Sequence, residues 1–224
     1  MGAPIGSHAP GLPLPLVRHT LVDMAADYRS TIAHYIAREA RPEEKYGHQP
    51  RLYALTRRIG AGLEYDDDVV FAAAWLHDLG VFTGHRPEDP IALSRWDNVA
   101  YALEKVPAIL AAVGFPAEKV PAVLEAIRTH QPGYDPVTPE ATILRDADML
   151  EQLGAIGVLR TICKVGRDTR YSTFTPAVAA LRSALADLPP RLRLDTTRAI
   201  AAEKIRILGL FLASLDEEAA GALY

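Results

Sequence analysis

The sequence lacks a second cysteine and lacks any long apolar run. Cys163 is the one cysteine among 224 residues, so the chain forms no internal disulfide, as is typical of proteins in reducing compartments. Apolar runs such as 69–76 and 108–113 are much shorter than the roughly 20 residues that span a bilayer. We therefore expect a cytoplasmic protein that does not span a membrane.

An excess of basic charge is lacking as well. The chain has 24 Lys and Arg residues against 28 Asp and Glu residues, and its formal net charge is -4. No global positive field would attract nucleic acid or an anionic membrane, so we expect neither as a partner. What is present is ordinary: 49% of the residues are hydrophobic and 23% are charged, which is enough to build a sizeable core.

Apolar residues recur at intervals of three or four along most of the chain, and this spacing predicts amphipathic helices. Start signals such as the aspartates at 66–68 and the Thr-Pro-Glu at 138–140 strengthen several of them. A Ser94–Asp97 pair resembles a capping box. Pro107 is expected to break or begin a helix. The predicted helices cover about 16–40, 52–63, 66–79, 94–105, 121–130, 139–165, 175–188 and 191–215.

No segment alternates in polarity as a half-buried strand would, and no linker interrupts the helical pattern. We therefore predict an all-α fold, a single-domain helical bundle over residues 16–224. Residues 1–15 lack the charged and apolar regions of a signal peptide, and we interpret them as a flexible N-terminal arm. Apolar helix faces near the termini are consistent with a homodimer.

Residues 72–80 read "AAAWLHDLG", an apolar helix that ends in His77 and Asp78. A carboxylate at the buried end of a helix is unfavourable unless it is paired, hydrogen-bonded or bound to a metal. The dipeptide by itself is weak evidence, because a histidine in the last turn can also cap carbonyl groups. Two ligands do not hold a metal, so a metal site requires further ligands from elsewhere in the chain.

Three other segments offer such ligands: His48 in "YGHQPRLYALTRRIG", His130 in "EAIRTHQPG", and two acids in "ILRDADMLEQLG". Asp146 and Asp148 lie about 200° apart around a helix, so they cannot both face one point. One would bind the metal while the other forms a salt bridge or hydrogen bond. From the residues alone, the two histidines can equally be helix-end residues and the acids a solvated edge.

The order of His48, His77-Asp78 and Asp148 resembles the HD-domain superfamily of metal-dependent phosphohydrolases. The resemblance covers about residues 45–160 and includes "GHQPRLYALTRRIG", "AAAWLHDLG" and "LRDADMLEQLGAIGVLR". It implies an all-α HD-type fold in which His48, His77, Asp78 and Asp148 bind a metal. The small single-domain bacterial members are the most similar.

The resemblance also sets limits on the metal site. Dinuclear branches of the superfamily carry two further histidines, and none lies near "IALSRWDNVA", where the first would be expected. One ion per chain is therefore favoured, with His130 as an acid/base or substrate contact, although a second ion near it is not excluded. Two imidazoles and two carboxylates suit Mn, Fe, Co, Ni or Zn and tolerate Mg.

The implied activity is hydrolysis of a small phosphorylated substrate, such as a nucleotide, by a metal-activated water. The resemblance assigns to Asp78 a second role as acceptor of a proton from that water. A phosphate ester also requires fixed positive charge, for which Arg51 and Arg145 are the candidates because each lies one helical step from a predicted ligand.

Other functions remain open. An HD-fold metalloenzyme of other chemistry, either a hydratase or a di-iron oxygenase, would keep the fold and the metal. A non-catalytic, metal-stabilised ligand-binding module is a further alternative. The substrate is not identified, because specificity would lie in the loops 81–93 and 131–138, whose residues follow no known pattern.

Overall fold

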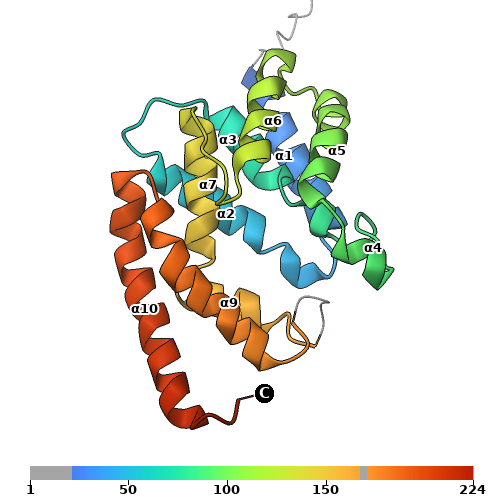
Figure 1. Cartoon of the computed structure of the whole chain (residues 1–224). Coiled ribbons are helices and arrows are strands. Elements are labelled where there is room, and N and C mark those ends of the chain that lie inside the picture. Colours follow the sequence, from blue (N-terminus) through green and yellow to red (C-terminus); the bar gives the residue numbers. More distant parts are fainter. Residues whose placement is uncertain (1–21, 167–170, 224) are drawn as a thin grey trace, which may run out of the picture.

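A computed structural model of the protein describes residues 22–166 and 171–223, and within them the chain forms ten α-helices, four short 3-10 helices and no strand. The prediction of an all-α fold is confirmed (Figure 1). The predicted arm at 1–15 and the first residues of the predicted helix at 16–40 lie outside the described residues. The α-helices are α1 (Val22–Glu39), α2 (His48–Ile59), α3 (Asp67–Leu76), α4 (Pro90–Ser94), α5 (Asn98–Ala112), α6 (Val120–Thr129), α7 (Pro139–Glu151), α8 (Gly154–Ile162), α9 (Phe174–Asp187) and α10 (Asp195–Ala219).

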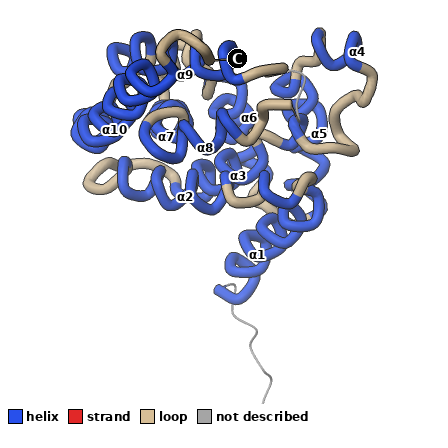
Figure 2. The backbone as a smooth tube through the Cα atoms, turned by 90° about the horizontal axis from the view of Figure 1, so that it is seen from below, coloured by secondary structure: helices blue, strands red, loops and turns tan. Residues whose placement is uncertain are grey.

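Helix α3 lies at the centre of the fold and contacts α1, α2, α6 and α7. Every residue from Val69 to Leu76 is buried, so this helix has no solvent-facing side. Figure 2 shows α9 and α10 at one end of the molecule and α4 and α5 at the other, with α2, α3, α6 and α7 between them. The end of α3 is therefore surrounded by protein, and the residues that follow it begin in the interior.

Helix α3 ends earlier than its sequence pattern predicts. It stops at Leu76, with His77 as its C-cap, and a 3-10 helix covers Leu79–Val81. At Gly80, which follows Asp78 by two residues, a Cβ atom would lie 2.6 Å from the carbonyl oxygen of Asn98. The glycine is required because the backbone of α5 packs directly against this turn, and the early end of the helix leaves Asp78 outside it.

Two boundary predictions near α5 were wrong. Asp97 alone caps α5, accepting hydrogen bonds from the backbone N–H groups of Val99 and Ala100, while the Ser94 hydroxyl donates to Ile91 within α4. Pro107 does not break the helix but lies inside it. Tertiary packing outweighs the local cost of the proline, because α5 buries an apolar stripe on both sides of it. The buried residues of that stripe are Val99, Ala102, Val106 and Leu110.

The predicted helix at 139–165 is two helices. α7 ends at Glu151, and α8 begins at Gly154, whose φ of +69° lies in the left-handed region that favours glycine. The break turns the chain at the end of α7, so α8 packs against both α7 and α10. As a result, the last turn of α7, which carries Asp148 and Glu151, is covered by later helices rather than extended into solvent.

Candidate metal centre

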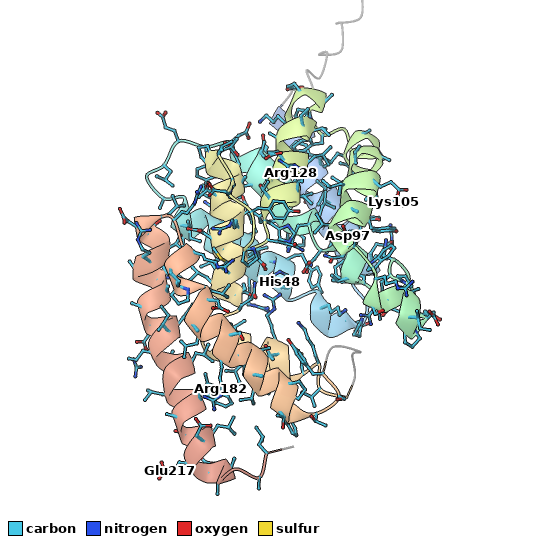
Figure 3. The ribbon with its side chains drawn as sticks, in the orientation of Figure 1. His48, Asp97, Lys105, Arg128, Arg182 and Glu217 are labelled. Atoms are coloured by element: carbon cyan, nitrogen blue, oxygen red, sulfur yellow. The ribbon has the colours of Figure 1, made fainter. Side chains whose placement is uncertain are left out.

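Three ligand candidates meet where α2 begins and α3 ends. His48 is the first residue of α2, His77 caps α3, and Asp78 follows it. One ligand atom of each lies within 4.8 Å of the others, so the three can hold a metal ion. The Oδ2 atom of Asp78 is 3.6 Å from Nε2 of His48 and 3.5 Å from Nε2 of His77. Figure 3 shows His48 in the middle of the bundle, beside α7.

The fourth predicted ligand also reaches this group. Oδ1 of Asp148, in α7, lies 3.5 Å from Nε2 of His48, and Oδ2 accepts a hydrogen bond of 3.3 Å from the Gln152 amide. Asp146, two residues earlier, faces away and accepts hydrogen bonds from the backbone N–H groups of Arg193 and Leu194. The two acids therefore have different partners, as their separation around the helix requires.

The imidazoles present their free nitrogens to the group. Nδ1 of His77 lies 3.1 Å from the carbonyl oxygen of Ala74, which accepts only from a protonated nitrogen, so Nε2 carries the lone pair. The Nε2 atoms of His48 and His77 are both buried and have no hydrogen-bond partner among the described residues. A buried nitrogen without a partner is unfavourable. A divalent ion would satisfy both, so these residues fit a metal.

Burial sets the charge states in the group. It lowers the pKa of His48 and of His130, which favours the neutral imidazoles that bind metals. Burial alone would raise the pKa of Asp78, but the positive charge that His77 and His48 carry when protonated outweighs it and holds that pKa below its usual range. The side chain of Asp78 is 20% exposed against 1% for His77, so the group opens to solvent on the carboxylate side.

His130 lies beside this group rather than within it. Its ring centroid is 4.9 Å from that of His77, and its Nδ1 is 2.6 Å from the carbonyl oxygen of Ile127. Its Nε2 is therefore the nitrogen that can contact a substrate or accept a proton. His85, which lies on the connection between α3 and α5, forms hydrogen bonds with Tyr101 and Glu39 and not with this group.

The two predicted phosphate-binding arginines differ. Arg51 lies one turn after His48, bonds Glu151 at 3.1 Å, and its side chain remains 41% exposed. Arg145 is not brought to the metal group, and we correct that assignment. Its buried guanidinium donates to the carbonyl oxygens of Arg191 and Pro132 and pairs with Asp146 at 3.6 Å, because α7 turns this side chain toward the α9–α10 connection.

Glu151 lies at the site, although the sequence pattern did not predict it as a site residue. Its carboxylate pairs with Arg160 at 3.5 Å, and it also lies 3.4 Å from Nδ1 of His48. Burial raises its pKa, but His48, Arg51 and Arg160 lower it more, to about 2. Its spacing was a usable signal, because residues three apart on a helix share a face and Glu151 follows Asp148 by three.

Comparisons with known proteins agree with this geometry. The family model for the HD domain matches residues 46–153, a range that contains His48, His77, Asp78 and Asp148. Residues 46–153 therefore contain an HD domain, and the resemblance seen in the sequence is confirmed. A comparison with curated protein sequences returned no match.

Several solved structures share the fold. Lin1889 from Listeria innocua is 20% identical, with a TM-score of 0.65 over 86% of this chain and 96% of its own. Bacillus subtilis YpgQ is 21% identical, with a TM-score of 0.65 over 86% and 96%, and it has also been crystallised in complex with ADP. An HD-superfamily hydrolase from Bacillus thuringiensis is 19% identical, with a TM-score of 0.62 over 87% and 97%. At these identities the likeness establishes the fold.

Across residues 22–166 and 171–223, no helix is both long enough and apolar enough to cross a membrane.

Proposed function

We propose that this chain is a divalent-metal-dependent phosphohydrolase acting on a small phosphorylated substrate. One observation carries the proposal: two buried Nε2 atoms without hydrogen-bond partners converge on the same carboxylate oxygen of Asp78. Hydrogen bonding among the described residues leaves both nitrogens unsatisfied, and a mixed set of imidazole and carboxylate donors suits a transition metal or Mg.

His48, His77, Asp78 and Asp148 would hold the ion, one per chain. A divalent ion bound there supplies an activated water nucleophile and polarises a phosphoryl oxygen. Asp78, the most exposed of the four, faces the open side, where its second oxygen can accept a proton. His130 borders the same space, and because its Nδ1 faces the Ile127 carbonyl, its Nε2 is the candidate to accept a hydrogen bond or a proton there.

Arg51 supplies the positive charge that a phosphate requires. Its guanidinium is held at one edge by Glu151 and remains partly exposed at the other, one helical turn from His48. An anion arriving at the metal group would therefore meet a pre-positioned donor, and such preorganised charge stabilises a phosphoryl-transfer transition state.

The structural relatives support a small phosphorylated ligand. YpgQ, which shares the fold, has been crystallised with ADP, and the Bacillus thuringiensis relative is described as an HD-superfamily hydrolase. A nucleotide is therefore the first substrate class to test with this chain, and the loops 81–93 and 131–138 are the segments we expect to select it.

Metal analysis beside a phosphatase screen tests the proposal. Wild-type protein should contain about one divalent ion per chain and hydrolyse a phosphorylated substrate. Asp78→Ala should lose both the ion and the activity, because the substitution removes a carboxylate that would bind the metal. Asp187→Ala, an exposed aspartate at the end of α9, is the matched control and should retain both.

Other outcomes would select the alternatives. Two irons per chain without phosphatase activity would indicate a di-iron oxygenase. One ion with saturable ligand binding and no product would indicate a binding module. A wild-type protein that takes up no ion under any loading condition would overturn the metal centre itself.

A further inference from the structure

Glu151 is a buried, charged side chain that the proposed reaction uses only to hold Arg51. It is 3% exposed and lies at the end of α7, one turn after Asp148. A buried carboxylate is unfavourable unless other groups stabilise its charge. Its three polar neighbours are Nδ1 of His48, the Arg51 guanidinium and the Arg160 guanidinium. The contact with His48 is the one that links it to the metal centre.

The two nitrogens of His48 face in opposite directions. Nδ1 lies 3.4 Å from Oε2 of Glu151, while Nε2 lies between Asp78 and Asp148 at 3.6 and 3.5 Å. A carboxylate only accepts hydrogen bonds, and the contact of Nδ1 with Glu151 is a hydrogen bond, whereas Nε2 has no hydrogen-bond partner among the described residues. This difference places the proton on Nδ1 and leaves the lone pair on Nε2. That tautomer is the one in which His48 can bind an ion held by Asp78 and Asp148.

The arginines hold this carboxylate in place. Nη2 of Arg51 is 3.1 Å and Nη1 of Arg160 is 3.5 Å from the same Oε2 atom that faces His48. They approach from α2 and α8, so helices on either side of α7 fix its position. His77 has no such partner, because its Nδ1 faces the backbone carbonyl of Ala74.

We propose that Glu151 is a positioning residue that fixes the tautomer and orientation of His48 for metal binding. The inference rests on the metal centre proposed above, but not on the choice of substrate. Outer partners of metal-bound histidines raise ligand basicity and restrict ring rotation, and their loss typically weakens metal binding about 10- to 100-fold.

Metal titration of three variants tests the proposal. In Glu151→Gln, which retains the size of the side chain but loses its charge, the Kd for Mn²⁺ should rise about 10- to 100-fold. Arg160→Gln breaks an ion pair of the same carboxylate but leaves the His48 contact, so its Kd should change by less than about threefold. Glu140→Gln, at the other end of α7, is the matched control and should bind as wild type does.

A purely structural role would give a different result. Glu151→Gln and Arg160→Gln would then lower the melting temperature alike, and both folded proteins would bind Mn²⁺ with wild-type affinity. That outcome would overturn the positioning role while leaving the metal centre intact. If the wild type itself binds no Mn²⁺, the metal centre fails first, so the two failures are distinguishable.

The wild-type protein provides a second test that requires no variant to fold. Nitrogen-15 NMR of the imidazoles in the metal-free protein at pH 8 should show His48 protonated on Nδ1 and not on Nε2. A His48 ring protonated on Nε2, or one that exchanges between the two tautomers, would overturn the proposal.

Discussion

Nε2 of His48 lies 3.6 Å from Oδ2 of Asp78, although 30 positions separate the two residues in the chain. The contact exists because α2 begins and α3 ends at the same place in the fold. Neither atom is positioned by its own helix alone, so the geometry of the candidate metal centre is a property of helix packing.

Replacing His48 should remove the metal without unfolding the protein. In His48→Gln the ion loses one of its two nitrogen donors. We expect the Kd for the metal to rise at least about 10-fold, because the loss of a residue that only contacts a metal ligand already has an effect of that size. His85→Gln is the matched control, because His85 is also partly buried but bonds Tyr101 and Glu39. Equal metal content in both variants, measured after dialysis, would contradict the assignment.

The two acids of α7 should separate stability from metal binding. Asp146 is fully buried and accepts three backbone hydrogen-bond contacts, so Asp146→Asn should lower the free energy of unfolding by about 2–4 kcal/mol. Asp148→Asn should change it by less than about 1 kcal/mol in the metal-free protein but weaken metal binding. Urea unfolding and metal titration of both variants test this prediction. Weaker metal binding in Asp146→Asn together with lower stability in Asp148→Asn would contradict it.

Asp68 should make the fold sensitive to acid. Burial raises its pKa, but hydrogen bonds from Lys119 and Arg29 lower it more, to below its usual range. A folded-state pKa below the unfolded one stabilises the protein above about pH 4, and that stabilisation is lost as the pH falls through the folded value. The difference in unfolding free energy between wild type and Asp68→Asn should be about 1–3 kcal/mol at pH 7 and should shrink below pH 4.

An exposed aspartate serves as the control for this pH dependence. Asp195 pairs with Arg198 at the protein surface, where screening by solvent makes an ion pair weak. Asp195→Asn should therefore leave the pH profile of unfolding unchanged. A difference between wild type and Asp68→Asn that stays constant from pH 7 to pH 3 would show that the Asp68 carboxylate does not titrate as predicted.

Adding one methyl group at Gly80 should disturb the turn that carries Asp78. The new Cβ would lie 2.6 Å from the Asn98 carbonyl oxygen and 2.8 Å from its Cα, and backbone atoms cannot move as a side chain can. Gly80→Ala should cost about 1–3 kcal/mol of stability. Gly209→Ala in α10, where a Cβ meets nothing within 4 Å, should instead stabilise by about 0.5–1 kcal/mol. Thermal unfolding of the two variants tests this prediction. Equal shifts of the melting temperature in Gly80→Ala and Gly209→Ala would contradict the close approach at Gly80.

The sequence by itself determined the features that depend on neighbouring residues. A three- to four-residue spacing of apolar residues specifies helices because it places one face of each against a core, and the all-α fold followed from it. The placement of His77 and Asp78 at the end of a buried helix was also local, and so was the separation of Asp146 from Asp148. These depend on helix geometry, which 10 to 20 consecutive residues contain.

Only the tertiary structure decided which distant groups share a partner. The sequence placed Arg145 beside the metal because it lies near Asp148, but packing of α7 against α10 directs it to Arg191 and Pro132. Packing also carried α5 through Pro107 and brought Glu151 to His48, 103 positions away. Such contacts depend on the angles and offsets between packed helices, which side chains from several helices set together and no single segment encodes.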